Sequence, residues 1–189
     1  MIDSDEKYAE QFVKLYHQIY LFLLKDYKTK TGKKLKTYKE YEPDYLKKAF
    51  IQYKDKKDLV SQASSFASKL IVIQALPNAN HRTAFLFIKY YLKKQGIGMQ
   101  IYSENKKMYD IFYEKSKSLI EQDINHEQIF NDSYMDVVHS KALKEHEKSM
   151  NKLMKEIIKL PQSGITTVES FHSFVASMNQ LGSLPFLNQ

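Results

Sequence analysis

The stretch QALPNANHRTA, residues 74–84, places several groups that could do chemistry within one short turn between two apolar helical patterns. It contains Asn78, Asn80, His81 and Arg82, polar side chains concentrated where the second helix should begin. The first N–H groups of a helix have no partner within it, and the helix dipole places about half a positive charge there. We therefore predict an anion site suited to phosphate at this turn, with Arg82 able to grip the anion through two donors.

Two helical patterns position this turn. The pattern before it starts near residue 57 and ends at Gln74, with apolar residues spaced by four and three at Leu59, Ala63, Phe66, Leu70 and Ile73. Pro77 stops this helix, because proline lacks the N–H and restricts the residue before it. Residues 78–80 carry short side chains that can cap the next helix. That helix, 81–95, is apolar on almost every side and ends at Gly96, so we predict it to be the most buried.

The rest of the chain also follows helical periodicity, so we predict an all-α bundle around the buried helix. Further helices are expected at 6–25, after Pro43, at 103–121, 134–160 and 166–180, with helix starts at Ser103, Ser133 and a Thr166–Glu169 capping box. The inward faces should hold Tyr8, Phe12, Leu15, Ile19, Phe22, Leu23, Tyr45, Leu46, Ala49, Phe50, Met108, Ile111, Phe112, Leu119, Ala142, Met150, Leu153, Ile157, Leu160, Val168, Phe171, Val175 and Met178. The basic stretch around Gly32 should be an exposed loop, and a small β-hairpin flap is allowed near residues 34–42.

The composition excludes several classes of function. The 189 residues contain no Cys, so disulfides, thiolate chemistry and cysteine metal sites are excluded, as is usual in a reducing cytoplasm. The segment MIDSDEKYAEQF is acidic and polar where an export signal would be basic and then apolar, and the apolar run 19–24 is too short to span a bilayer. No Gly-rich phosphate loop or dinucleotide fingerprint occurs. We therefore expect a cytoplasmic protein with no membrane partner.

Much of the net charge of +7 lies in residues 25–57, which include KDYKTKTGKKLKTYKEY. Such a segment could attract nucleic acid, an anionic nucleotide or an acidic protein partner by long-range electrostatics. It could equally be a solvated lysine-rich surface, since Asp and Glu are interspersed.

The remaining histidines carry little signal, and we expect surface or hydrogen-bonded core positions for His17, His126, His139, His146 and His172. His139 and His146 lie seven residues apart on one predicted helix, hence about 10 Å along its axis, which is too far to share one metal ion easily.

The turn and the helices on either side of it resemble the Fic and death-on-curing (Doc) family, grouped as the Fido fold. In that family a helix leads into a pattern of the form HxFx(D/E)(G/A)Nx(R), with which the next buried helix begins. The counterpart here consists of Gln74, Ala75, Leu76, Pro77, Asn78, Ala79, Asn80, His81 and Arg82. Thr83 and Ala84 extend the match, since a common variant reads NKRTA. The stretch EPDYLKKAF from Glu42 is also similar, so the resemblance covers about residues 42–100.

The resemblance implies a Fic/Doc-like helical domain over residues 1–125, with 126–189 as a C-terminal helical extension packed on it. Such a domain binds a nucleoside triphosphate, ATP foremost, with Mg²⁺, and transfers AMP, or a phosphate in Doc-like members, to a hydroxyl of a target protein. Asn80 and Arg82, with the backbone of the turn including Ala79, would hold the phosphates. The implied partners are a target protein and an antitoxin-like regulator.

Several positions depart from the family pattern. Gln74 stands where the family has the His that acts as general base on the target hydroxyl. An amide cannot take up the proton of that hydroxyl. Loss of a positioned base typically lowers the rate about a hundred- to ten-thousand-fold. Asn78 replaces a carboxylate that binds Mg²⁺, and its amide oxygen is a weaker ligand for this cation. His81 replaces a Lys of Doc members, where a protonated imidazole could meet a phosphate. Leu76 and Phe85 replace a Phe anchor and a second Arg.

Two explanations of these departures stay open. Either the protein binds nucleotide without transferring it, or His81 or a residue from another segment acts as the base; of the two, we expect weak or absent transfer. The alternative function is a basic all-α module without enzymatic activity, which binds nucleic acid or a protein through residues 25–57 and uses the turn only for structure.

Overall fold

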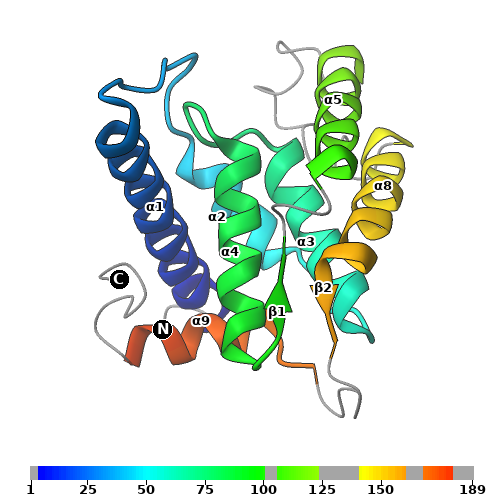
Figure 1. Ribbon diagram of the computed structural model, residues 1–189. Helices are drawn as coiled ribbons and strands as arrows, with labels where there is room; N and C mark the ends of the chain where they lie inside the picture. Colours follow the sequence, from blue (N-terminus) through cyan, green and yellow to red (C-terminus); the bar gives the residue numbers. More distant parts are fainter. Residues whose placement is uncertain (1–3, 101–105, 124–140, 161–167, 181–189) are drawn as a thin grey trace.

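The computed structural model describes residues 4–100, 106–123, 141–160 and 168–180, and these ranges are mostly helical with two short strands (Figure 1). The elements in chain order are α1 (Ser4–Thr31), α2 (Pro43–Ile51), α3 (Leu59–Val72), α4 (Asn80–Lys94), β1 (Gly98–Met99), α5 (Lys106–Asp123), α8 (Lys141–Ile157), β2 (Ile158–Lys159) and α9 (Phe171–Gln180). The all-α fold predicted from the sequence is confirmed.

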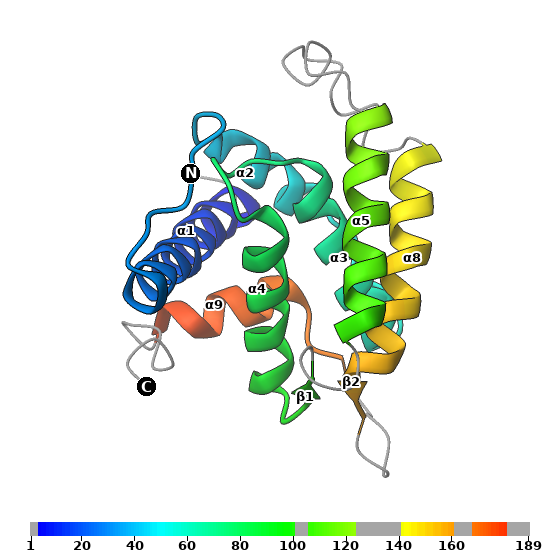
Figure 2. The same cartoon turned by 45° about the horizontal axis from the view of Figure 1, so that its top comes forward.

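Helix α4 stands in the middle of the bundle. It packs against α1 and α3, while α2 and α9 both pack against α1 (Figure 1). On the other side of α4, α5 and α8 run side by side, and α8 packs along α3 (Figure 2). The N-terminal end of α4 therefore faces α1 on one side and α5 on the other.

The hydrophobic core between these helices is built largely from aromatic rings. Ring centroids lie 4.8 Å apart for Phe12 and Phe50, 5.4 Å for Phe12 and Phe87, and 4.3 Å for Phe66 and Phe171. Phe171 of α9 is fully buried in this cluster. The described part of residues 126–189 thus shares one hydrophobic core with residues 1–125.

Helix α3 is more buried than the sequence pattern indicates. Twelve of its 14 residues are buried, against ten of the 15 residues of α4, so the prediction that the fourth helix is the most buried is wrong. Part of the difference comes from serines, which count as polar in a pattern but are buried here; two of these hydroxyls donate hydrogen bonds, whereas that of Ser68 has no partner among the described residues. The Ser64 hydroxyl donates to the Val60 carbonyl, and that of Ser65 donates to Glu147 of α8. Small side chains with internal partners let α8 pack closely.

Helix α5 is rotated relative to the predicted face. Met108 and Ile111, expected to point inward, are 39% and 62% exposed, whereas Phe112 and Ser116 are buried. The pattern misleads because the polar Ser116 occupies a core position. Its burial is possible because its hydroxyl is hydrogen-bonded on both sides.

The ends of the C-terminal helices also differ from the prediction. Helix α8 ends at Ile157, where the strand β2 follows, and Leu160 is 52% exposed. Helix α9 is capped by Ser170, whose Oγ accepts from the Ser173 N–H at 3.0 Å, while Glu169 precedes the helix. The predicted helix starts at Ser103, Ser133 and Thr166 lie outside the described residues.

The β structure does not lie near residues 34–42. Strands β1 and β2 form an antiparallel pair in which Gly98 faces Lys159 and Met99 faces Ile158. Segment 33–42, which follows the end of α1 at Thr31, contains no strand. Its backbone bonds to the turn instead, because the N–H groups of Tyr38 and Glu42 donate to the carbonyls of Pro77 and Ala75 at 3.1 and 2.9 Å.

Candidate functional site

The turn between α3 and α4 contains two non-glycine residues in the left-handed backbone region, Gln74 with φ 47° and Ala79 with φ 55°. Gln74 follows the C-cap of α3, and its side-chain Nε2 donates back to the Ile71 carbonyl. Ala79 is the N-cap of α4 and has no side chain that could accept from the first N–H groups. The start of α4 therefore lacks a side-chain cap, and the predicted capping by Asn78 or Asn80 is wrong.

Asn80 closes the turn. Its Oδ1 accepts from the Leu76 N–H and its Nδ2 donates to the Leu76 carbonyl, both at 3.0 Å. The same Nδ2 also approaches Gln74 Oε1 at 3.4 Å. The side chain predicted to hold phosphate is therefore used inside the turn, and it contributes to a site by shaping the backbone.

Asn78 ties the turn to two other segments. Its Oδ1 accepts from the hydroxyl of Tyr20 in α1 at 3.1 Å, and its Nδ2 donates to the Lys36 carbonyl at 2.9 Å. Both side-chain groups thus have protein partners, and the residue is only 8% exposed. This arrangement explains why an amide, which donates as well as accepts, suits the position.

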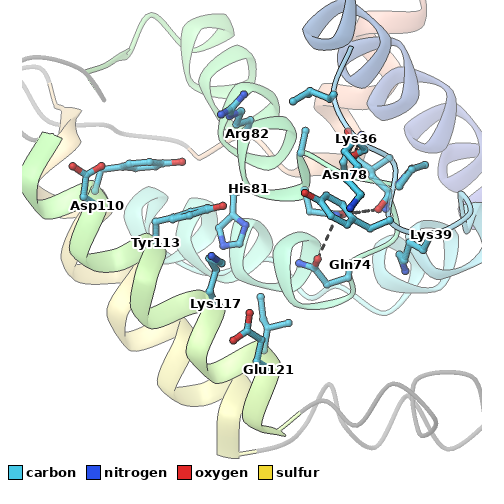
Figure 3. A pocket seen from close by; sticks show the side chains of 18 residues that line it. Lys36, Lys39, Gln74, Asn78, His81, Arg82, Asp110, Tyr113, Lys117 and Glu121 are labelled. Carbon is cyan, nitrogen blue, oxygen red and sulfur yellow. Dashed lines mark hydrogen bonds between the residues drawn. The ribbon is translucent and has the colours of Figure 1, made fainter. Parts of the chain in front are cut away.

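A cavity of about 820 Å³ opens where the turn, segment 35–39 and α5 meet (Figure 3). This volume lies in the usual range for small-molecule sites. The residues predicted from the sequence all line it: Gln74, Asn78, Ala79, Asn80, His81 and Arg82. Figure 3 shows His81, Tyr113 and Lys117 gathered on the α5 side, with Gln74, Asn78, Lys36 and Lys39 opposite. The turn thus forms one wall of a cavity.

Cations outnumber anions along the cavity wall. Lys36, Lys39, Arg82 and Lys117 contribute positive charge, while Asp110 and Glu121 contribute negative charge. Within the part of the chain that the structure describes, Arg82 has no acidic partner and lies 5.9 Å from the centre of the Tyr27 ring. The Lys117 ammonium similarly lies 5.5 Å from the Tyr113 ring. These two cations are available to an anionic ligand.

The acidic residues of the cavity do not form a metal site of their own. Asp110 is paired with Lys106, and Glu121 lies 11 positions later on the same helix, about 16 Å along the axis. No group of three or more His, Asp or Glu residues suited to a metal ion occurs in the described ranges. A divalent cation at this site would need oxygen atoms from a bound ligand, as phosphates commonly supply for Mg²⁺.

His81 is joined to two residues that the sequence pattern did not connect with it. Its Nε2 lies 2.7 Å from the Ser116 Oγ of α5, which lies 2.6 Å from the Nε2 of His146 in α8. Burial lowers the pKa of His81 to about 3, helped by the charges of His146 and Lys117, and burial lowers the pKa of His146 to about 4. His81 is therefore neutral at pH 7 and brings no positive charge of its own to the cavity.

A signal for His146 was present in the sequence. It lies in register with Leu143, Met150, Leu153 and Ile157, the buried face of α8, and the structure buries it to 1% exposure. Ser116 follows Phe112 by four residues in the same way. A polar residue at a core position of the helical pattern indicated a buried polar group. Only the packing of the helices shows which polar groups contact one another.

The lysine-rich segment 25–57 spans the end of α1, the following loop and α2. Three of its lysines have acidic partners: Lys30 with Asp26, Lys39 with Glu42, and Lys47 with Glu6 and Glu10. Lys33 and Lys34 are exposed. The segment is therefore a partly neutralised surface in which one edge, Lys36 and Lys39, belongs to the cavity.

None of the described helices is long and apolar enough to cross a membrane. In comparisons with known proteins, no curated protein and no solved structure matches the chain. Residues 1–112, from α1 into α5, match a family of unknown function, DUF8172. Because this match covers more than half of the 189 residues, the chain belongs to the family DUF8172.

Proposed function

We propose that the protein binds the phosphates of a nucleoside triphosphate, ATP foremost, in the cavity at the start of α4, as a Fic/Doc-like domain would. One observation carries the proposal: the turn singled out by that resemblance forms the wall of an 820 Å³ cavity, at a helix start without a side-chain cap. Free backbone N–H groups and the helix dipole favour an anion there. Arg82 and Lys117 add two cations without acidic partners among the described residues.

Transfer of AMP or phosphate to a target protein is expected to be weak or absent. Gln74 cannot act as a general base, and its side chain is engaged by Ile71 and Asn80. The neutral His81 is a poor substitute, because a pKa of about 3 makes it a weak proton acceptor. Mg²⁺ would enter with the nucleotide, with Asn78 as a weak further ligand. A cytoplasmic location, a target protein and an antitoxin-like regulator belong to the same proposal.

Isothermal titration of the full chain with ATP or GTP, each with Mg²⁺, tests the proposal. We expect saturable binding that Arg82→Ala weakens by roughly tenfold to a hundredfold, the usual loss when a charged hydrogen-bond donor to phosphate is removed. Lys89→Ala is the matched control, since Lys89 is an exposed cation of the same helix outside the cavity. If the two substitutions weakened binding equally, general electrostatic attraction would explain the binding, and the proposed site would be wrong.

The alternative function is tested in the same experiment with DNA and RNA oligonucleotides. If neither nucleotide binds while an oligonucleotide binds with a steep salt dependence, the proposal is wrong and the basic module is supported. The substitutions Lys33→Ala and Lys34→Ala should then weaken oligonucleotide binding, because both lysines are exposed in segment 25–57.

A further inference from the structure

Three helices contribute to one buried polar chain, His81 of α4, Ser116 of α5 and His146 of α8. Ser116 and His146 are each 1% exposed, whereas His81, at 8%, also lines the cavity. Both imidazoles present Nε2 to the same hydroxyl, at 2.7 and 2.6 Å. The chain therefore connects the cavity wall to the interior between α5 and α8.

The protons of this chain can be counted. A serine hydroxyl has one proton and can donate to only one of the two imidazoles, so the other imidazole must donate its Nε2–H to the oxygen. Burial keeps both imidazoles neutral at pH 7, so each ring carries a single N–H. Two arrangements satisfy these conditions, and they differ in the direction in which the hydrogen bonds run.

His146 decides between the two arrangements. Its Nδ1 is buried and has no partner among the described residues. A buried N–H without an acceptor is rarer than a buried acceptor without a donor. His146 therefore keeps its proton on Nε2 and donates to Ser116, and Ser116 donates to Nε2 of His81. The single proton of the His81 ring is then on Nδ1.

We propose that His81 donates its Nδ1–H to a phosphate group bound at the start of α4, and that Ser116 and His146 are positioning residues that hold this tautomer. The inference rests on the proposed function, since it assigns a further donor to the same anion. The positive charge of Lys117 also disfavours a second proton on the His81 ring. A neutral donor held in one orientation adds to the N–H groups of α4 without a buried charge to solvate.

Nitrogen-15 spectra of the imidazoles of the full chain at pH 7 test the tautomers directly. Single substitutions assign the signals, and the wild-type spectrum then shows which ring nitrogen carries the proton. We expect Nδ1–H for His81 and Nε2–H for His146. The reverse pair of tautomers, or a doubly protonated His81 without ligand, would overturn the inference.

Two substitutions at position 81 separate the two ring nitrogens. The amide nitrogen of Asn lies near the place of Nδ1, and that of Gln lies near the place of Nε2. His81→Asn should keep the affinity for ATP with Mg²⁺ within about threefold, whereas His81→Gln should weaken it by roughly tenfold, because a donor to the phosphate is lost. Thermal unfolding of both variants verifies that each is folded.

Ser116→Ala tests the positioning role. We expect His81 to become a mixture of tautomers and the dissociation constant for ATP to rise by about threefold or more. Ser64→Ala is the matched control, because it removes another buried hydroxyl, one that donates to the Val60 carbonyl in α3. Ser64→Ala should leave the tautomer of His81 and the affinity unchanged.

The outcomes separate this inference from the proposed function. If ATP binds in an Arg82-dependent manner but its addition does not shift the His81 Nδ1 signal, the donor role is wrong and the proposed function stands. If ATP, GTP and inorganic phosphate all fail to bind the wild-type protein, the proposed function and the donor role are both wrong. The wild-type spectrum still decides in that case whether Ser116 and His146 fix the tautomer.

Discussion

Asn80 folds back onto the backbone of Leu76, accepting from its N–H and donating to its carbonyl, both at 3.0 Å. Through this pair the first residue of α4 closes the turn that precedes the helix. Asn80 therefore preserves the geometry of the cavity wall, whether or not a ligand contacts its side chain.

Asn80→Ala should destabilise the fold. It leaves the N–H and carbonyl of the buried Leu76 without their partner, and each buried group left unpaired costs about 1–3 kcal/mol. Urea unfolding measures the change, with Asn151→Ala of α8 as the control of equal size. A free energy of unfolding equal in the two variants would show that the turn does not depend on this pair.

Ala79→Gly should leave the free energy of unfolding unchanged or raise it by up to about 1 kcal/mol, because alanine is strained in the left-handed region and glycine is not. Ala176→Gly in α9 should lower it by about 1 kcal/mol, since glycine is unfavourable in a helix with negative φ. Thermal unfolding compares the two variants. If Ala79→Gly lowered the free energy of unfolding as much as Ala176→Gly does, the backbone of Ala79 would not be strained at the N-cap.

Gln74→His tests whether the missing base alone limits transfer. If so, labelled ATP should modify a protein substrate, or the chain itself, with a rate gain of about a hundred- to ten-thousand-fold, the usual effect of a positioned base. Gln74→Asn, an amide that cannot take up a proton, is the control. Intact nucleotide binding without any gain would instead implicate Asn78, whose amide replaces the expected metal-binding carboxylate, or another missing group.

Stability should fall in acid because of His81 and His146. Burial lowers the pKa of both from 6.5, to about 3 and about 4, so below pH 6.5 the unfolded chain binds protons that the folded chain does not. Their full contribution is present above pH 6.5 and is progressively lost as the pH falls towards the folded values. At pH 5 the loss should be roughly 2 kcal/mol for each imidazole.

Urea unfolding at several pH values measures this loss. His146→Gln should reduce the slope between pH 6.5 and 4, because one of the two titrating rings is gone, while Ser64→Ala should preserve it. The wild-type protein is compared with a double variant that lacks both imidazole rings. If the free energy of unfolding of the wild type changes no more over this pH range than that of the double variant, His81 and His146 are not buried in the neutral form.

The turn and its flanking helices could be predicted from local signals. Pro77 and the apolar periodicity on either side place a break between α3 and α4, and the observed α4 begins at Asn80, one residue before the predicted start. The inward face of α5 could not be predicted, because Ser116 counts as polar until its two imidazole partners are known. The predicted roles of Asn80 and Arg82 towards phosphate stay predictions.

By itself the sequence determined the helical class, the position of the turn and the residues that form one wall of the cavity, because helix periodicity and breaks are local properties of the chain. Only the tertiary structure decided what the polar side chains do. Asn78 and Asn80 are engaged by Tyr20, Lys36 and Leu76, and His81 meets Ser116 and His146 from helices that follow it in the chain. Apart from the local Asn80–Leu76 pair, these partners are chosen by packing between distant segments, which no local pattern encodes.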